Sequence, residues 1–530
     1  MKTSVRRTRL VLALALAVLV LALALGLVLA LSGGDGPAEG AAKLVPGDAL
    51  AYVHLSTDEG RAATRRAGAL VGRFPDYPKL RDRVLSSLHL SAAGQGAALA
   101  RDVRPWIGKE AALALVPLAD RAVALTVIDV RRRDRARQFL TRFGRPTAQP
   151  AYRGVPTALY GAQAAAFVSH YLVIGPPAAV TEAIDAQAGR RSALAGQGAY
   201  RRAMKGAPDG RVADLYASSA GVRQVLAPRG GVLGAVGGLL DQPALAGAAL
   251  TLSAQGDGAR ARLHTVLDPG QAAPPSPFAP FTPSLPAQAQ GPATAWLQLS
   301  GIGAAGPRLL GAVPTGGAGA RIAAVLGQLG RALSARGVDL NRDVLPVLQG
   351  EFALEITPGI PLPTLTLIAR TRDEAGARAA FAQLQGPLAQ IFAPTGSGPG
   401  VAPTFTEETV AGVDVFRLRL SAVRELDYAV FDGRLVASTS LQGIAAARSA
   451  GPRLASDADF RAATAERPKK VTSLVFLDFR QLLGLIEQTG LSQNPRYRAV
   501  RADLARIRSA GLTSSRQESE STVELNLKIP

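Results

Sequence analysis

Two short sets of charged residues are the best placed for chemistry in this sequence. In each set an Arg-Asp pair is followed eight residues after the aspartate by a glutamate that opens an apolar, strand-like run. The sets are Arg101, Asp102 and Glu110, and Arg342, Asp343 and Glu351. Paired carboxylates of this kind can act as general acid and base. At a loop-to-strand corner, however, they more often form a cap or a packing salt bridge, and we favour that structural interpretation because the set occurs twice.

A second candidate is the segment Gly301-Ile-Gly303-Ala-Ala-Gly306, which has the G-x-G-x-x-G spacing of dinucleotide-binding loops. Such glycines let a pyrophosphate approach the N-terminus of a helix. The motif also requires an acidic residue about 20 residues further on, at the end of a second strand. Residues 320–328 read ARIAAVLGQ and contain neither Asp nor Glu. We therefore predict no nucleotide cofactor.

The histidines and cysteines offer little for catalysis or metal binding. His54, His89, His170 and His264 are scattered and form no H-E-x-x-H or similar pair. The chain has no cysteine, which excludes thiolate nucleophiles, cysteine-ligated zinc, iron–sulfur clusters and disulfides. Neither a G-x-S-x-G elbow nor a P-loop motif is present. We predict no catalytic, cofactor-binding or metal-binding residue, and therefore a protein that is not an enzyme.

The N-terminus has the pattern of a membrane anchor. Residues 1–9 contain four basic residues, and residues 10–31 form an uncharged apolar run of 22 residues. A helix of this length spans about 33 Å at about 1.5 Å per residue, enough to cross a bilayer core. The basic flank predicts a cytoplasmic N-terminus, with the rest of the chain on the other side of a cell membrane. A signal peptide cleaved near Ala30-Leu31-Ser32 is the alternative, although its apolar region usually has only about 7–15 residues.

The rest of the chain carries the same pattern twice. The stretch Ala49-Leu-Ala-Tyr-Val-His-Leu-Ser56 returns as Ala293-Thr-Ala-Trp-Leu-Gln-Leu-Ser300, and an Arg-Asp-Val-x-Pro stretch begins at both Arg101 and Arg342. This internal duplication predicts two homologous lobes. The predicted segments are a flexible tether (32–43), a first lobe (44–270), a Pro-rich linker (271–290) and a second lobe (291–530).

The duplication also tests the chemical candidates. In register with the glycine motif, the first lobe reads Thr57-Asp-Glu-Gly-Arg-Ala62, so none of the three glycines recurs. His54 is replaced by Gln298, and His170 is replaced by Asp432. Exchanges of this kind are typical of polar packing or turn positions rather than of ligands and bases.

Apolar, strand-like runs alternate with helical segments in both lobes. The stretch Phe431-Asp-Gly-Arg434 contains the Asp-Gly pair that is typical of a two-residue hairpin turn. Hairpins interleaved with single helices predict an α+β fold. We expect each lobe to be a mainly antiparallel sheet with helices packed on one face, following one transmembrane helix.

The net charge is +20, and only 8 of the 60 basic residues are lysine. The densest basic run is Arg131-Arg-Arg-Asp-Arg-Ala-Arg137, at the predicted start of a helix, where positive charge opposes the helix dipole. Attraction to anionic envelope polymers or lipids is one interpretation. An arginine-rich composition without any ligand is the other. Aromatic residues make up only 5% of the chain, which argues against nucleic acid as a partner.

Several of these stretches together resemble a known family. They are the N-terminal anchor, Val45–Leu55, Arg101–Glu110 and the hairpin Tyr428–Val436. The chain is similar in them to the uncharacterised bacterial family named domain of unknown function 3352, over essentially everything after the tether. The resemblance implies a membrane-tethered envelope protein and assigns no catalytic residue.

These observations predict a single-pass membrane protein with a non-catalytic role in the cell envelope, as a scaffold or binding module. Its first expected partner is the lipid bilayer, through residues 10–31. Two other functions stay open. A carrier of lipids or other hydrophobic ligands would line a groove with helices rich in small residues, such as Gly230–Leu240. An enzyme would bring Asp343 and Glu351 together in a solvent-exposed cleft.

Overall fold

The structure is a computed structural model, and its described residues begin at Gly36. They are residues 36–75, 102–119, 121–141, 144–226, 240, 244–271, 278–301, 331, 334–335, 349–360, 362–391, 403–421, 423–488 and 491–530. The predicted cytoplasmic segment 1–9 and transmembrane segment 10–31 lie outside them. Across the part of the chain that the structure describes, no helix is both long enough and apolar enough to span a membrane.

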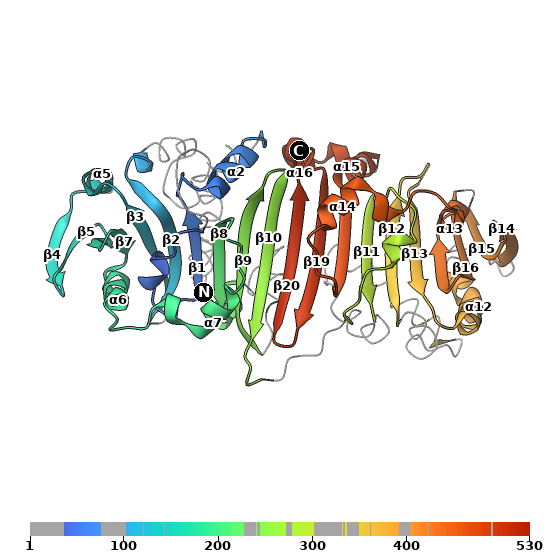
Figure 1. The fold of residues 1–530 in the computed structure, drawn as a ribbon, viewed down its shortest axis with the longest axis horizontal. Coiled ribbons are helices and arrows are strands. Elements are labelled where there is room, and N and C mark those ends of the chain that lie inside the picture. Colours follow the sequence, from blue (N-terminus) through green and yellow to red (C-terminus); the bar gives the residue numbers. More distant parts are fainter. Residues whose placement is uncertain are drawn as a thin grey trace.

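The described strands form one continuous sheet of 20 strands (Figure 1). The first ten are β1 (Ala51–Ser56), β2 (Ile107–Leu118), β3 (Arg121–Val130), β4 (Thr147–Tyr152), β5 (Val155–Tyr160), β6 (Gln163–Val168), β7 (Tyr171–Gly175), β8 (Arg211–Ser218), β9 (Leu245–Gln255) and β10 (Gly258–Leu267). The last ten are β11 (Ala295–Ser300), β12 (Glu351–Thr357), β13 (Thr364–Arg370), β14 (Phe405–Val410), β15 (Val413–Ser421), β16 (Arg424–Phe431), β17 (Arg434–Ser438), β18 (Ser473–Asp478), β19 (Ser509–Gln517) and β20 (Glu520–Lys528).

The strand pairing is antiparallel throughout the described sheet, and its order occurs twice. The first ten strands lie in the order β4-β5-β6-β7-β3-β2-β1-β8-β9-β10. The last ten continue as β20-β19-β18-β11-β12-β13-β17-β16-β15-β14. Each strand of the second series thus has a counterpart ten strands earlier. We refer to β1–β10 with their helices as the first half, and to β11–β20 with theirs as the second half.

The two halves meet where β10 pairs with β20, from Gly258 opposite Lys528 to Val266 opposite Glu520. A Cβ atom at Gly258 would overlap the carbonyl of Leu527, so the close approach of the two strands there requires glycine. Polar pairs also cross this junction; for example, Arg260 Nε donates to Asn526 Oδ1 at 3.0 Å. The two predicted lobes therefore share a single sheet.

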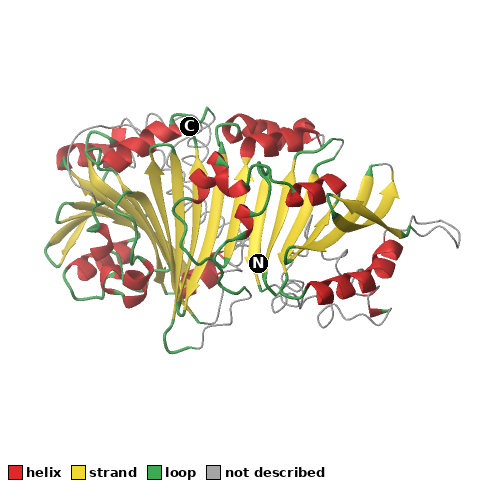
Figure 2. Ribbon diagram, turned by 45° about the vertical axis from the view of Figure 1, so that its right-hand side comes forward, coloured by secondary structure: helices red, strands yellow, loops and turns green. Residues whose placement is uncertain are grey.

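Helices cover both faces of this sheet (Figure 2). They are α2 (Ala62–Val71), α5 (Arg133–Leu140), α6 (Pro177–Gln187), α7 (Gly198–Ala203), α8 (Ser219–Gly221), α12 (Glu374–Ile391), α13 (Leu441–Arg448), α14 (Ala458–Thr464), α15 (Phe479–Gln488) and α16 (Pro495–Leu504). On β6, Ala164 and Ala166 pack with Val180 of α6, whereas Ala165 between them packs with Ala136 of α5. Successive strand residues point to opposite faces. The prediction of helices on one face is therefore wrong, because strands with apolar residues at consecutive positions need cover on both sides.

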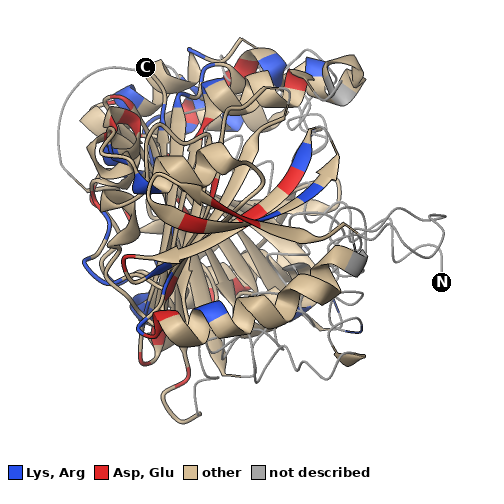
Figure 3. Cartoon of the chain, turned by 90° about the vertical axis from the view of Figure 1, so that its right-hand side faces the viewer, with Lys and Arg blue, Asp and Glu red and all other residues tan. Residues whose placement is uncertain are grey.

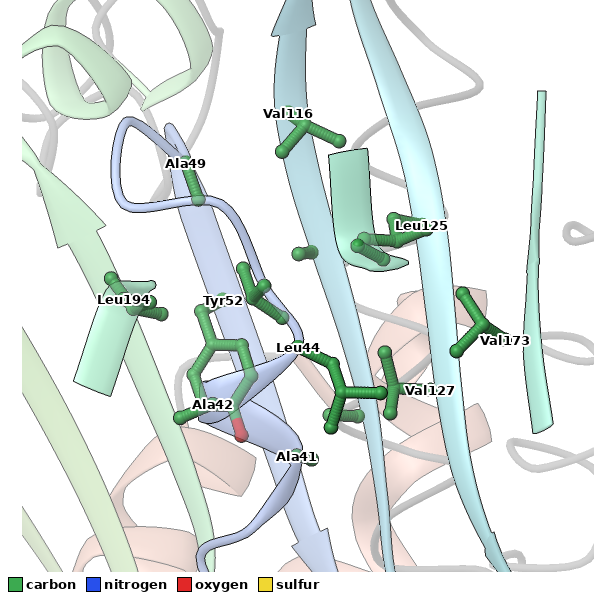
Figure 4. Packing of buried hydrophobic residues seen from close by; sticks show 14 of the residues in the cluster. Ala41, Ala42, Leu44, Ala49, Tyr52, Val116, Leu125, Val127, Val173 and Leu194 are labelled. Carbon is green, nitrogen blue, oxygen red and sulfur yellow. The ribbon is translucent and has the colours of Figure 1, made fainter. Parts of the chain in front are cut away.

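The predicted tether and linker each end inside the fold. Residues Ala41–Lys43 form the 3-10 helix η1, whose alanines are buried beside Tyr52 and Leu44 (Figure 4). In the second half, Leu285–Ala287 form the 3-10 helix η5, and Phe281 pairs with Val471 beside β18. The remaining short helices are η3 (Leu194–Gly196), η4 (Val222–Leu226), η8 (Leu454–Ser456) and η9 (Leu491–Gln493). Apolar residues within both segments therefore pack into the core.

Candidate functional site

Glu110 and Glu351 lie at equivalent positions near the start of β2 and β12, and each binds the N-terminus of a 3-10 helix. Glu110 accepts hydrogen bonds from the backbone N–H of Gly40 at 2.9 Å and of Ala41 at 3.2 Å, at the start of η1. Glu351 accepts them from Ser284 at 2.6 Å and from the next residue at 3.1 Å, at the start of η5. Free N–H groups at a helix start carry partial positive charge, which stabilises a carboxylate there. Both glutamates are caps, one of the two structural roles considered from the sequence.

A buried ion cluster adjoins the capping glutamate of the first half. His54 on β1 is 2% exposed and lies between two carboxylates. Its Nδ1 is 2.9 Å from Asp214 Oδ2, and its Nε2 is 3.3 Å from Glu110 Oε2. Arg211 Nε lies 2.9 Å from the other carboxylate oxygen of Asp214, and Glu39 pairs with the same guanidinium. A bulge in β8 beside residue 211 lets Arg211 and Asp214 reach one another.

The electrostatics make His54 an ion-pair partner rather than a base. Burial lowers the pKa of His54, but the hydrogen bonds with Asp214 and Glu110 outweigh burial and raise this pKa to about 9. Burial raises the pKa of Glu110, but the hydrogen bond and charge of His54 bring it below its usual value. An imidazole that is protonated at neutral pH has no lone pair with which to accept a proton. In this cluster, buried charges neutralise one another.

A hydroxyl group completes each cap, and it comes from a different element in each half. Tyr171, the first residue of β7, donates to Glu110 Oε1 at 2.5 Å. In the second half, Ser284 Oγ donates to Glu351 Oε2 at 2.6 Å. Gly40 is the counterpart of Ser284, and a Cβ atom there would overlap the Tyr171 hydroxyl. The tyrosine of the first half thus fills the place that the serine side chain fills in the second.

In the second half, the positions equivalent to the ion cluster hold neutral residues. They are Gln298 for His54, Leu474 for Asp214 and Val471 for Arg211. Gln298 Nε2 donates to Glu351, and its oxygen accepts from Trp296 Nε1 at 3.1 Å. A neutral amide therefore takes the place of the charged imidazole, and Arg370, 3.9 Å from Glu351, adds a charge from β13.

The second half instead buries a polar row beneath α13, across β16, β17, β13 and β12. In cross-strand register the row is Asp427, Ser438, Thr366 and Glu355. Asp427 is 0% and Glu355 is 5% exposed, and the two hydroxyls lie 3.1 Å apart. Among the described residues, Glu355 Oε1 and both oxygens of Asp427 have no hydrogen-bond partner. The equivalent row of the first half is apolar: Ala164, Gly175, Leu125 and Ala114.

Burial raises the pKa of both carboxyls in this row. For Glu355 burial raises it to about 7, and for Asp427 burial and the charge of Glu425 both raise it. Arg417 on the neighbouring strand pairs with Glu425 at 2.6 Å and with Glu408 at 3.1 Å. Acidic and basic residues lie side by side on this terminal group of strands (Figure 3). Arg417 Nε also lies 3.6 Å from Asp427 Oδ1. The arginine thus faces the Asp427 end of the row, and Glu355 lies at the other end, on β12.

A groove of about 400 Å³ lies between α2, the turn before β8 and the β9–β10 hairpin. It is lined by Arg66, Pro208, Gly210, Ser253, Ala254, Gln255, Gly256 and Arg260. Gly36 lies beside it, since a Cβ atom there would be 3.9 Å from Asp209 Oδ1. Two arginines and two glycines therefore surround an open space next to the first described residue.

The remaining predicted residues are described only in part. Asp102 is half-buried ahead of β2. The residues outside the description are Arg101, Arg342, Asp343, His89, Gly303, Gly306 and 230–239. The convergence of Asp343 and Glu351 is therefore untested. Within the described residues, no group of three His, Asp or Glu side chains is placed to hold a metal ion.

The structure also describes His170, His264 and part of the basic run. His170 is exposed in the β6–β7 turn, whereas His264 on β10 is buried, with Nδ1 2.9 Å from Ala203 O. The basic run enters α5, where Arg133 and Arg137 lie 5.7 and 5.5 Å from the centre of the Phe167 ring. Cation–π contacts of this kind position part of the run on the protein itself.

Sequence reasoning missed buried charged residues of the ion cluster and of the polar row. They are Arg211, Asp214, Glu355 and Asp427. A usable signal was present, because Asp214 interrupts the apolar run Val-Ala-Asp-Leu-Tyr and Glu355 interrupts Phe-Ala-Leu-Glu-Ile. A charge inside an apolar strand indicates a buried partner or a shifted pKa.

Comparisons with known proteins give a family but no activity. A comparison with curated proteins finds no match. The similar solved structures include crystal forms III, IV and I of TP0453, with 10%, 11% and 10% sequence identity and TM-scores of 0.29, 0.26 and 0.28. The matches cover 47%, 43% and 47% of this chain, and 90%, 83% and 90% of TP0453. A similarity this low says nothing about function. The family model described as "Protein of unknown function (DUF3352)" matches residues 8–529, which confirms the resemblance seen in the sequence, and the chain belongs to that family.

Proposed function

We propose that this protein is anchored in the cell membrane by one helix and serves the cell envelope, outside the cytoplasm, as a non-catalytic scaffold or binding module. The proposal of a non-catalytic role rests on one observation: the shared glutamates are engaged in capping helices. Glu110 and Glu351 are shared acidic residues of the two halves at this corner, together with Asp102 and Asp343 in the sequence, and both glutamates cap 3-10 helices inside the fold. At Glu110 burial raises the pKa, but the hydrogen bonds with His54, Tyr171 and Ala41 bring the pKa below its usual value, so this carboxylate is a weak base.

The anchored location is supported by the sequence and by the surroundings of Gly36. The apolar run ends at Leu31, five residues before Gly36, and a Cβ atom at Gly36 would lie 3.9 Å from Asp209 Oδ1. A long flexible tether is therefore not needed, and the folded part would lie close to the bilayer.

Fractionation of cells that express the full chain tests the anchor. We expect the chain to stay in the membrane pellet after alkaline carbonate extraction. We also expect an added protease to degrade the folded part in spheroplasts with an intact membrane. A soluble chain that begins near Ser32 would overturn the anchor in favour of a cleaved signal.

We also infer that the two halves arose by internal duplication. The repeated strand order, together with a glutamate-capped 3-10 helix at the same place in each half, supports this origin. An experimental structure in which β11–β20 follow a different order would overturn it.

The carrier hypothesis makes a distinct prediction. Purified full-length chain would then accelerate the transfer of a labelled phospholipid between donor and acceptor vesicles. A scaffold or binding module leaves the transfer rate at its protein-free value. Acceleration in proportion to protein concentration would replace the proposed function by the carrier.

A further inference from the structure

We propose that the groove beside Gly36 binds the phosphate group of an anionic phospholipid in the membrane that anchors the chain. This inference rests on the proposed function, because it needs the bilayer next to the start of the fold. Three independent features lead to it: the donors that line the groove, its fixed architecture and its distance from the end of the apolar run.

The lining of the groove is rich in hydrogen-bond donors. Arg66 on α2 is exposed, and its Nε reaches Ala254 O at 3.4 Å, a long hydrogen bond. Arg260 on β10 contributes a second guanidinium from the facing hairpin. The hydroxyl of Ser253 is buried and has no hydrogen-bond partner among the described residues. Planar guanidinium groups bind phosphate with paired hydrogen bonds, so this combination suits a phosphate oxyanion.

The groove is built from fixed elements. Arg61 is 1% exposed and donates to Arg211 O at 3.0 Å and to Asp209 O at 2.5 Å, which holds the turn before β8 against α2. No atom lies within 4 Å of a Cβ position at either Gly210 or Gly256. The walls therefore leave open space beside two stretches of glycine backbone, where a headgroup can approach closely.

The position of the groove matches the headgroup layer. Five residue steps separate Leu31, the end of the apolar run, from Gly36, and they span at most about 18 Å when fully extended. The headgroup region of each leaflet is about 5–8 Å thick. Because Gly36 lies beside Asp209 between two lining residues, the groove cannot lie far from the lipid headgroups.

Two carboxylates lie near the groove: that of Asp209 is exposed beside Gly36, and that of Glu466 competes with a phosphate for Arg260. Glu466, whose side chain is 55% exposed, pairs with Arg260, and Gln255 Nε2 lies 3.4 Å from it. An incoming phosphate would displace this exposed partner from the guanidinium. Neutralising Glu466 should therefore strengthen binding, the opposite of the effect of removing an arginine.

The experiment is a lipid titration of the full chain in detergent, followed by native mass spectrometry. Phosphatidylglycerol is compared with phosphatidylcholine of the same acyl chains. We expect the wild type to prefer phosphatidylglycerol, and Arg66→Gln/Arg260→Gln to bind it about tenfold more weakly or worse, since each charge-assisted hydrogen bond contributes substantially. Arg66→Gln alone should give part of this loss, and Glu466→Gln should bind a few-fold more tightly.

A matched control is Arg201→Gln/Arg202→Gln on α7, which removes the same charge from two exposed positions away from the groove. We expect this pair to bind like the wild type. A loss in the control as large as in the groove variant would show a general charge effect and overturn the site. Equal affinity for the two lipids would overturn it as well. Thermal unfolding of each variant shows whether it is folded, and Arg66→Gln leaves the β10–β20 junction intact.

Two further measurements are needed. One distinguishes a lipid phosphate from a soluble phosphate ligand, and the other distinguishes failure of the groove site from failure of the proposed anchor. Free inorganic phosphate and glycerol phosphate are added as competitors. Displacement of phosphatidylglycerol at low millimolar concentration would assign the groove to a soluble phosphate ligand and overturn the lipid. A chain released from membranes by alkaline extraction would refute the proposed anchor. A chain that stays in the membrane but shows no lipid preference refutes the groove site alone.

Discussion

The two halves of the sheet share a strand order and a glutamate-capped 3-10 helix, yet they bury charge at different places. The first half surrounds its cap with His54, Asp214 and Arg211, where the second has neutral residues. The second half buries Asp427 and Glu355 beneath α13, where the first half is apolar. The same scaffold therefore accepts charged or neutral residues at equivalent buried positions.

This difference separates what the fold needs from what each half adds. The cap serves backbone N–H groups that would otherwise be buried without a partner, and both halves keep it. A buried ion cluster can be replaced by packed neutral residues at little cost, provided that no single charge is left behind. The four predictions below test this distinction, from the largest expected effect to the smallest.

The largest effect should follow from breaking the ion cluster of the first half. Asp214→Ala removes the buried carboxylate that His54 and Arg211 share. It leaves the two cations with Glu110 and Glu39 as their remaining carboxylate partners. We expect the free energy of unfolding to fall by about 3–5 kcal/mol, measured by urea unfolding with far-UV circular dichroism. The control is the triple variant His54→Gln/Arg211→Val/Asp214→Leu, which installs the residues of the second half. It should lose much less, and a triple variant as unstable as Asp214→Ala would show that the two solutions are not interchangeable.

The second prediction concerns the pH dependence of His54. Its folded-state pKa of about 9 lies above the usual 6.5, so the folded state binds the proton more tightly than the unfolded state does. The resulting stabilisation is complete below about pH 6.5 and is lost as the pH rises through 9, by up to about 3 kcal/mol. Unfolding free energies measured between pH 6 and about pH 10 should show this fall in the wild type, and His54→Gln should remove it. An equal fall in the variant would assign the effect to another group.

The third prediction concerns Glu355 in the second half. Its pKa is raised by burial, whereas burial lowers the pKa of His54 and the carboxylate partners of His54 raise it. Burial raises the pKa of Glu355 from 4.5 to about 7, so the unfolded state ionises first and stability falls as the pH rises between these values. Glu355→Gln should therefore be more stable than the wild type at pH 8, by about 1–3 kcal/mol, with little gain at pH 4.5. Glu110→Gln provides the contrast. The pKa of Glu110 is lowered, so this variant should lose stability at pH 8.

The smallest effect should come from exchanging the hydroxyl that completes the cap. Gly40→Ser in the first half introduces an overlap with Tyr171 and should cost about 1–3 kcal/mol. Tyr171→Phe removes one hydrogen bond to Glu110 and should cost about 1 kcal/mol. The double variant copies the second half, in which serine supplies the hydroxyl. A double-mutant cycle from thermal unfolding should show that the serine rescues the phenylalanine, and strictly additive losses would contradict this equivalence.

Much of the local structure could be predicted from the sequence. The strand-like runs and the hairpin at Asp432-Gly433 depend on residues close in sequence, and the repeated pattern singled out Glu110 and Glu351. The helix starts that these glutamates cap lie 70 and 67 residues away in sequence and could not be predicted from it. The buried cluster could not be predicted in the same way. His54 and Asp214 are 160 residues apart and meet only because β1 pairs with β8 in one register. A shift of one residue would turn either side chain to the other face.

The sequence by itself determined the family, the repeated order of elements and the two shared glutamates, because these depend on local pattern and on comparison of one half with the other. Only the tertiary structure decided that the halves continue one sheet through β10 and β20, that helices cover both faces, and which charges are buried together. These features depend on contacts between distant segments. Each segment alone carries an apolar pattern that several partners would satisfy, and the choice among partners is made by the packing of the whole chain.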